Sequence, residues 1–406
     1  MKKFIFKLSV FLGPFLVALA LELFVLPIDF FTFRVHEALV VRKFRNILGG
    51  KFYPNRNLIK EEEGDLGHHT KYAFKRTVQW FTDSHGYRKK ESGQLKYEVV
   101  IVGQSETFGA SLTQKEMLSE MLEEQLHVGV YPFAPAGVNS FLKERRFILY
   151  PPRIVIVTSM EKAIFLLPSA KIRSGRNWGF LASVKERIET MRENRWVQSL
   201  GVFLDRLYKM NMLHYLRASI ERKFSDRSRF SSTWVDTQYG PIFFLDGAKV
   251  NREVEEKEMD RVVRTIKDYD DVFRRRGIRF IFLPIPNKET IFYESLGTQR
   301  PIFLRQLVAR LRELNVETVD TQEIFEQAFQ KNILLYQKDD SHWNAEGVKI
   351  AVGLIKTFIE KKIPKTAFPW EKIKDPLSSR VGESILSSLN APLFFEFGRL
   401  VAKLEK

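Results

Sequence analysis

The 406-residue sequence contains no cysteine. It therefore forms no disulfide, holds no thiolate-bound metal and uses no cysteine nucleophile. A cysteine-free chain suits a reducing compartment as well as an oxidising one, so this absence alone assigns no location.

Several nucleotide- and metal-binding signatures are also missing. No Gly-x-Gly-x-x-Gly follows an apolar run, and Gly103-x-Ser105 lacks the Gly-Lys-Ser/Thr ending of a phosphate-binding loop. The sequence has no zinc-finger or RNA-recognition signature and no His/Asp/Glu cluster with metal-ligand spacing. The formal net charge of +16 would suit nucleic acid, anionic lipid or an acidic glycan. Because only the charge favours nucleic acid as a partner, we expect no nucleic-acid partner. Because the nucleotide- and metal-binding signatures are missing, we also expect no cofactor and no bound metal.

The first thirty residues form a long apolar run after a basic start. The basic residues are Lys2, Lys3 and Lys7. Residues 8–28 are mostly strongly apolar, with Pro14 and Glu22 among the interruptions, and about 20 apolar residues span a bilayer. Ala18-Leu19-Ala20 is typical of a signal-peptidase site, so a cleaved signal peptide is the alternative. Since the apolar run continues beyond that site, we predict a retained signal anchor over residues 1–33.

The basic N-terminus predicts a single span with that end inside the cell. The expected location is the inner (cytoplasmic) membrane, with the rest of the chain in the periplasm. Basic residues also follow the apolar run, at Arg34, Arg42, Lys43 and Arg45, and they weaken this orientation.

From residue 97 onward, short apolar runs of strand type alternate with helical patterns. The expected strands are residues 98–103, 127–133, 153–159, 278–284 and 316–320. The expected helices are residues 114–125, 139–149, 253–276, 301–314, 323–330 and 345–360. This alternation predicts an α/β fold with a doubly wound, mostly parallel five-stranded sheet and helices on both faces. Active-site loops in such folds follow the carboxyl ends of the strands.

The chain divides into four expected parts. These are the signal anchor (1–33), a stalk and lead-in (34–79), the α/β domain (80–362) and a C-terminal tail (363–406) with an amphipathic helical pattern at 393–404. Residues 171–250 break the alternation and are rich in arginine, lysine and aromatic residues. We interpret them as a mostly helical basic insertion, either a cap over the site or a solvated basic face. The acidic run at residues 61–65 is expected to be a surface loop.

Two segments hold the parts of a nucleophile–base–orienter relay. Residues 102–109 (Val-Gly-Gln-Ser-Glu-Thr-Phe-Gly) place Ser105 directly after an apolar run. Residues 339–344 (Asp-Asp-Ser-His-Trp-Asn) place Asp340 two residues before His342, ahead of a helical pattern. Serine, histidine and carboxylate form such a relay when a fold brings them together.

These motifs resemble those of the SGNH (GDSL-type) hydrolase superfamily. Residues 83–88 (Asp-Ser-His-Gly-Tyr-Arg) resemble the Asn-x-x-Gly-Phe-Arg lead-in of bacterial members. Residues 283–290 resemble the Pro-x-Lys strand end of membrane-anchored members and of alginate-acetylation SGNH-like proteins. The resemblance covers residues 80–362 apart from the insertion. In the alginate-acetylation proteins the Asp-x-His-Trp segment precedes the serine, whereas here the serine comes first, as in ordinary SGNH esterases.

The resemblance implies a role for each site residue. Ser105 would be the nucleophile and His342 the general base. Asp340 would orient the imidazole, with Asp339 as the fallback acid. Backbone N–H groups of Ser105 and Gly137 would form part of an oxyanion hole.

The oxyanion side departs from the family pattern. Gln104 and Glu106 stand where an Asp and a Phe are usual. The family's oxyanion Asn would fall at residues 160–162, which are Met-Glu-Lys. Asn139 is the candidate substitute donor. Loss of one oxyanion donor typically costs about 10²–10³ in rate, so the resemblance leaves activity open.

The function implied is acyl transfer through an acyl-serine, by an O-acetyl esterase or O-acetyltransferase acting on a cell-surface or exported polysaccharide. The alternative is a catalytically inactive SGNH-like module that binds an acidic glycan or scaffolds an acyltransferase complex. The expected partners are cytoplasmic-membrane lipid, the polysaccharide and a membrane acyltransferase that supplies the acyl group.

Overall fold

The computed structural model describes residues 1–68, 70–170, 194–223, 233–245 and 254–360. Residues 1–358 form one compact unit. The amphipathic pattern expected at 393–404 lies outside the described residues.

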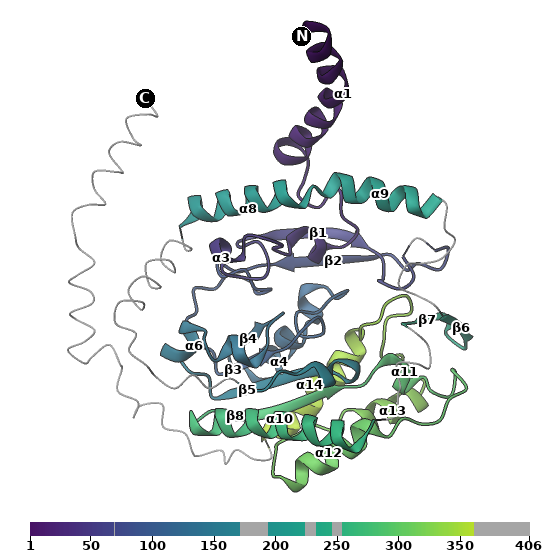
Figure 1. Ribbon diagram of the computed structural model, residues 1–406. Coiled ribbons are helices and arrows are strands. Elements are labelled where there is room, and N and C mark those ends of the chain that lie inside the picture. The colour runs from purple at the N-terminus through teal and green to yellow at the C-terminus, as the bar shows by residue number, and fades with distance from the viewer. Residues whose placement is uncertain (69, 171–193, 224–232, 246–253, 361–406) are drawn as a thin grey trace, which may run out of the picture. The chain divides into compact units, whose positions relative to one another are not determined.

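The centre of this unit is a four-stranded parallel sheet (Figure 1). Its strands are β3 (Val99–Val102), β4 (Val130–Phe133), β5 (Ile154–Met160) and β8 (Arg279–Ile285), in the order β4-β3-β5-β8. Nearly every strand residue is buried, as expected of a parallel sheet covered on both faces. Strand β4 lies on one side of β3 and strand β5 on the other. In open α/β sheets, ligands bind beyond the carboxyl ends of the strands where the chain changes sides in this way, so we expect the site after β3.

The expected fifth strand, residues 316–320, is reduced to one parallel bridge between Phe282 and Thr318. Phe282 donates its N–H to Glu317 at 2.8 Å, and Val319 donates to Phe282 at 3.0 Å. The next donor on β8 in this ladder would be Pro284, which has no N–H. The pairing therefore ends after two hydrogen bonds, and the prediction of five strands is corrected to four.

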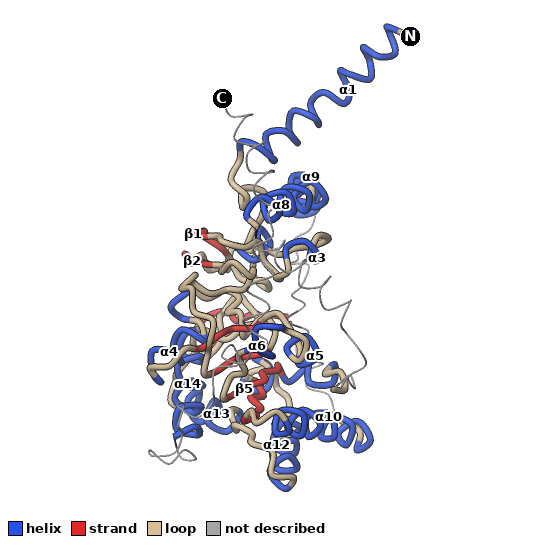
Figure 2. Tube along the Cα trace, turned by 90° about the vertical axis from the view of Figure 1, so that its left-hand side faces the viewer, coloured by secondary structure: helices blue, strands red, loops and turns tan. Residues whose placement is uncertain are grey.

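Helices cover both faces of the sheet (Figure 2). One side carries α4 (Leu118–Leu126), α13 (Gln322–Gln330) and α14 (Ala345–Glu360). The other carries α5 (Val138–Phe141), α6 (Arg145–Leu149), α10 (Glu256–Arg275) and α12 (Phe303–Glu313). Every second strand residue packs against α5, α6, α10 and α12 in one buried cluster. Side chains of a strand alternate between its two faces, so this period of two is expected.

Residues 34–79 fold into a second core instead of an extended stalk. This part contains α2 (Val35–Leu39), α3 (Arg45–Leu48) and the antiparallel pair β1 (Asn57–Glu62) and β2 (Arg76–Phe81). Its buried residues include Val35, Leu39, Phe52, Tyr53, Trp80 and Phe108. Phe108 belongs to the loop after β3, so this core packs directly against the nucleophile segment.

The described part of the insertion consists of α8 (Arg195–Lys209), α9 (Asn211–Lys223), β6 (Thr233–Thr237) and β7 (Gly240–Phe244). Helix α8 packs on the second core, where the Asp205 carboxylate accepts the backbone N–H groups of residues 42–44 and the Tyr53 hydroxyl. The hairpin instead borders the histidine-bearing loop, because Phe243 donates its N–H to Lys338 at 2.9 Å. Helix α8 thus packs on the second core, and the hairpin reaches the site.

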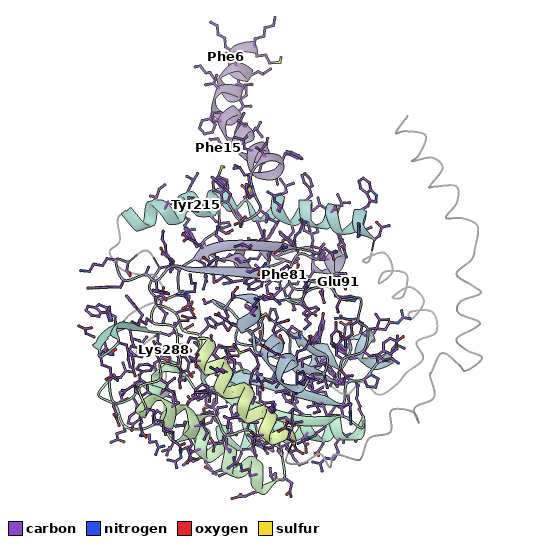
Figure 3. The ribbon with its side chains drawn as sticks, turned by 180° about the vertical axis from the view of Figure 1, so that it is seen from behind. Phe6, Phe15, Phe81, Glu91, Tyr215 and Lys288 are labelled. Carbon is purple, nitrogen blue, oxygen red and sulfur yellow. The ribbon has the colours of Figure 1, made fainter. Side chains whose placement is uncertain are left out.

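The N-terminal apolar run is helical. It forms α1 (Lys2–Ala20) and continues as η1 (Leu21–Val25). Of the described helices, this one is long and apolar enough to cross a membrane. No residue of α1 is buried, and large side chains such as Phe6 and Phe15 are exposed (Figure 3). These properties fit both a retained anchor and a signal sequence.

Candidate functional site

Ser105 lies in the tight turn that follows β3. A side chain at Gly103 would place its Cβ 2.1 Å from the hydroxyl oxygens of both Thr107 and Thr158, so only glycine allows this close crossing of β5. The Gly103 carbonyl also accepts the N–H of Ala136, which ties the turn to the loop after β4. Ser105 is partly exposed at the carboxyl edge of the sheet.

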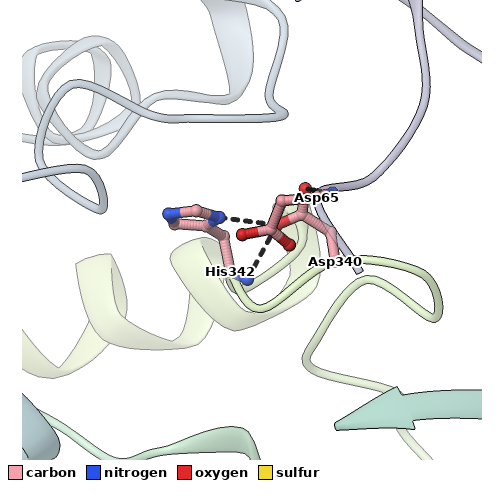
Figure 4. A group of neighbouring side chains, drawn as sticks. All are labelled: Asp65, Asp340 and His342. Atoms are coloured by element: carbon pink, nitrogen blue, oxygen red, sulfur yellow. Dashed lines mark hydrogen bonds and ion pairs between the residues drawn. The ribbon is translucent and has the colours of Figure 1, made fainter. Parts of the chain in front are cut away.

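Asp340 and His342 form a tightly bonded pair (Figure 4). Asp340 Oδ1 lies 2.5 Å from His342 Nδ1 and accepts the backbone N–H of His342 at 2.9 Å. Asp340 Oδ2 accepts the Ser111 hydroxyl at 2.6 Å and the Asp65 N–H at 2.9 Å. This fixes the imidazole with Nδ1 on the carboxylate and leaves Nε2 for a reacting group.

The electrostatics of the pair favour an imidazolium–carboxylate ion pair. Burial lowers the pKa of His342, but the carboxylates of Asp340, Asp65 and Glu106 outweigh burial and raise this pKa to about 9. Burial likewise opposes ionisation of Asp340, yet His342 and the nearby Arg76 hold the Asp340 pKa well below its usual range. At neutral pH the imidazole is therefore mostly protonated.

Glu106 joins the serine to the histidine. The Ser105 hydroxyl donates to Glu106 Oε2 at 3.2 Å, and Glu106 Oε1 lies 3.9 Å from His342 Nε2. Among the described residues, Ser105 and His342 share no direct hydrogen bond, and the buried Oε1 of Glu106 has no hydrogen-bond partner. The sequence marked Glu106 only as a departure from the family. In the structure the Glu106 carboxylate lies between the Ser105 hydroxyl and His342 Nε2.

Asp339, the fallback acid, holds a different loop. Its carboxylate accepts the N–H groups of Gly64 at 2.8 Å and Phe74 at 2.9 Å, and it pairs with Arg76. A Cβ on Gly64 would lie 2.0 Å from the Asp339 carbonyl oxygen, so glycine is required for this approach. None of the described contacts of Asp339 reaches His342, which leaves Asp340 as the acid on the imidazole.

Sequence reasoning missed Asp65 and Ser111. Asp65 follows β1 in the acidic run expected to be a surface loop, but its carboxylate accepts the backbone N–H of Ser341 at 2.8 Å and its hydroxyl at 2.7 Å. Glu62 of the same run is buried and accepts the Val35 N–H at 3.0 Å. The surface-loop expectation is therefore wrong. Both missed residues belong to loops, where side-chain direction follows no period that a sequence displays.

Arg88 shapes the segment after Ser105. This fully buried guanidinium donates to the carbonyl groups of Phe108, Gly109 and Leu112 and stacks over the Trp80 ring at 3.9 Å. Burial lowers the pKa of Arg88 to about 9. These contacts of Arg88 hold the turn that contains Ser111, whose hydroxyl donates to Asp340. The motif at residues 83–88 thus has a positioning role.

The two backbone N–H groups expected in an oxyanion hole belong to the loops after β3 and β4. Within the described part of the chain, the N–H groups of Ser105 and Gly137 donate to no backbone carbonyl. Gly137 precedes α5 and lies in the loop after β4. The candidate substitute Asn139 directs its side-chain amide to the Ser169 carbonyl at 3.0 Å.

The end of β5, where the family has its Asn, carries Glu161. This buried carboxylate accepts the N–H of Asn287 at 3.0 Å, just before α11 (Lys288–Ile291), and the hydroxyl of Thr290 in that helix. Burial raises the pKa of Glu161 to about 7. Its oxygens bind the neighbouring loop, so β5 contributes no amide donor at this position.

Asp65, Asp340 and His342 also satisfy the distance criterion for a metal site, because their ligand atoms lie within 4.8 Å of one another. Every carboxylate oxygen of this group already accepts a hydrogen bond from the protein. An ion would have to displace those donors. The arrangement is complete as a hydrogen-bonded orienter for the imidazole.

Comparison with known families bears on this site. Residues 242–375 match the family model described as the SGNH hydrolase-like domain of the acetyltransferase AlgX. The chain is similar to this AlgX domain. The expected SGNH resemblance is thereby confirmed. A comparison with curated proteins gives no match.

The AlgX-like segment begins inside β7 and contains Asp340 and His342, whereas Ser105 lies outside it. It also contains Lys288 (labelled in Figure 3). The buried ammonium group of Lys288 donates to the carbonyl groups of Gln337, Lys338 and Asp340. Burial lowers the pKa of Lys288 to about 8.

Lys288 therefore fixes the loop that carries the Asp340–His342 pair. Asn344 ends that loop by accepting the N–H of Gly347 at 3.0 Å, which caps α14. The adjoining Trp343 is buried packing. Within the AlgX-like segment, then, a buried lysine and a helix cap position the loop that carries His342.

Proposed function

We propose that this protein catalyses serine-dependent acyl transfer, as an O-acetyl esterase or O-acetyltransferase on an exported polysaccharide. The observation that carries the proposal is the bonded Asp340–His342 pair, which lies beside the serine turn of β3 with Glu106 between them. The similarity to the AlgX domain supports acetyl as the acyl group and polysaccharide as the class of acceptor.

In the proposed reaction, Ser105 Oγ attacks the ester carbonyl carbon of the acyl donor. Its proton passes to His342 Nε2 once the Glu106 carboxylate withdraws from the gap. The oxyanion is held by the N–H groups of Ser105 and Gly137. The leaving alkoxide takes the proton back from His342, which yields the acyl-serine and the free alcohol.

The second half-reaction transfers the acyl group to water or to a sugar hydroxyl. The acceptor oxygen loses its proton to His342 and attacks the acyl-serine carbonyl, and Ser105 regains a proton as it leaves. A sugar acceptor gives an O-acetylated polysaccharide. In that case we propose a membrane acyltransferase as the source of the acyl donor, and a periplasmic domain anchored in the inner membrane by residues 2–25.

A second function, an inactive glycan-binding module, is favoured by one observation. The Ser105 hydroxyl is bonded to Glu106 and not to His342. The basic insertion gives this alternative limited support, since Lys209 is buried against the carbonyl of Ala38 at 2.9 Å and Arg206 bonds to the carbonyl of Leu23 at 3.2 Å.

The test uses the purified full chain with p-nitrophenyl acetate as donor and alginate as acceptor. The proposal expects p-nitrophenolate release above background and new O-acetyl groups on the polysaccharide, both dependent on Ser105. Alginate binding without either product would instead support the inactive module.

The pH dependence is a separate prediction. A general base must be neutral, so the rate should rise with pH through the His342 pKa of about 9. The groups that face His342 include Asp340, Asp65, Glu106 and His36. Glu106→Gln removes one raising charge. The midpoint should therefore move to lower pH, with about a tenfold gain at neutral pH for each unit that the pKa falls.

Initial rates between pH 6 and 10 measure this midpoint. Glu91→Gln is the matched control, because Glu91 is an exposed carboxylate bonded to Ser84 and Gly93. The control should keep the midpoint of the parent. An unchanged midpoint in Glu106→Gln would show that Glu106 does not face the base.

A further inference from the structure

Helices α8 and α9 carry apolar side chains on an exposed face. The exposed members are Trp196, Leu200, Leu207, Leu213, Leu216 and Ile220, which together define the α8–α9 apolar surface. Trp196 is 80% exposed, Leu200 56% and Ile220 59%. Spacings of three, four and seven residues place the members from each helix on one face of it.

The core-facing side of α8 is a different stripe. Gln198, Val202, Asp205 and Lys209 are buried. Three of these, Gln198, Val202 and Lys209, follow the exposed Trp196, Leu200 and Leu207 by two positions each. Two positions correspond to about 200° around a helix of 3.6 residues per turn. The α8 part of the apolar surface therefore points away from the second core, and packing within the unit does not account for it.

The end of the N-terminal apolar helix lies at the junction of α8 and α9 (Figure 1). The buried Glu22 carboxylate accepts the N–H of Asn211 at 2.8 Å, and Arg206 donates to the Glu22 carbonyl. The Phe24 ring packs on Phe203, with centroids 5.8 Å apart. Where α1 and η1 leave a membrane, α8 and α9 must therefore lie at its surface.

The composition around the apolar surface suits a lipid headgroup layer. Trp196 and Tyr208 are exposed aromatic residues with polar groups, which favour the membrane–water interface. Arg195 and Arg42 are exposed, and Lys43 Nζ lies 6.0 Å from the centre of the Tyr208 ring. Basic residues at this level attract anionic phospholipid.

We propose that the α8–α9 apolar surface lies in the headgroup layer of the membrane in which residues 2–25 are anchored. The inference rests on the anchor in the proposed function and is independent of catalysis. Because α8 packs on the second core, and the loop after β1 in that core brings Asp65 to the site, this contact would hold the acyl-transfer site at a fixed height above the bilayer.

The absence of cysteine allows a direct test on the full chain. Single variants Leu200→Cys and Ile220→Cys carry a nitroxide label in nanodiscs of phosphatidylglycerol and phosphatidylethanolamine. Leu314→Cys, at the exposed end of α12, is the matched control. Power saturation by electron paramagnetic resonance compares collision of each label with oxygen, which concentrates in lipid, and with a water-soluble nickel complex.

The proposal expects oxygen to dominate at the two surface sites and the nickel complex to dominate at the control. Water-like accessibility at both surface sites would overturn it. Protection from both reagents, or dipolar broadening that grows with protein per disc, would also overturn it, in favour of a protein partner or a second copy. N-terminal sequencing of the membrane-extracted chain tests the anchor separately, because a chain that starts at Leu21 has lost it.

Discussion

Replacing Ser105 with alanine should lower acetyl transfer from p-nitrophenyl acetate by about 10³-fold or more. The variant loses the only atom that forms the acyl-enzyme bond in the proposed reaction. The fold should persist, because Ser105 is partly exposed and, among the described residues, its side chain bonds to Glu106 alone. The measurement is the initial rate of p-nitrophenolate release, with acetyl groups on alginate counted in parallel.

The control for this experiment is Ser92→Ala. Ser92 is an exposed loop serine, so its loss should leave the rate and the melting temperature near those of the parent. A Ser105→Ala protein that retains the parent's rate would show that hydrolysis occurs elsewhere on the chain. The proposed nucleophile would then be wrong.

Replacing Asp340 with asparagine should lower the rate by about 10⁴-fold, since the imidazole loses the carboxylate that fixes its tautomer and stabilises its charged form. The pKa of His342 should fall from about 9, because Asp340 is the strongest group raising it. The change should also destabilise the fold by about 3–5 kcal/mol, since a buried ion pair loses one partner. Rates should be compared at a temperature where both proteins are folded.

Asp339→Asn separates this effect from general damage to the loop. Asp339 is equally buried, but it bonds to Gly64, Phe74 and Arg76 and not to the imidazole. The variant should lose stability and keep the His342 pKa close to the parent value in an NMR titration. If Asp339→Asn lowers this pKa and Asp340→Asn does not, the assignment of the orienting acid is reversed.

Much of the sheet could be predicted because parallel strands are apolar throughout. Residues 99–102 and 154–157 form continuous valine and isoleucine runs, which is typical of strands buried on both faces. The fifth strand was overestimated because Val316 and Val319 gave a strand pattern, while Pro284 on its partner prevents the ladder. Residues 34–79 were missed because β1 is mixed and partly exposed, so it lacked a clear apolar run.

The site residues likewise fall into those that the sequence could predict and those that it could not. Ser105, Asp340 and His342 could be predicted because each lies in a short motif that resembles the SGNH pattern. Asp65, Ser111 and Glu106 complete the site through contacts across the fold. Asp340 accepts from Ser111, which lies 229 residues away in sequence. Contacts of that span depend on loop conformation, which a single sequence does not display.

The most direct test of the central claim is the site of acylation. The full chain is mixed with p-nitrophenyl acetate, quenched in acid within one turnover, digested and mapped by mass spectrometry. The proposed function predicts one acetyl group on the peptide that contains Ser105, absent from Ser105→Ala and strongly reduced in His342→Ala, which lacks the base that accepts the serine proton. Acetylation confined to lysine side chains, with no acetyl group on Ser105, would contradict it.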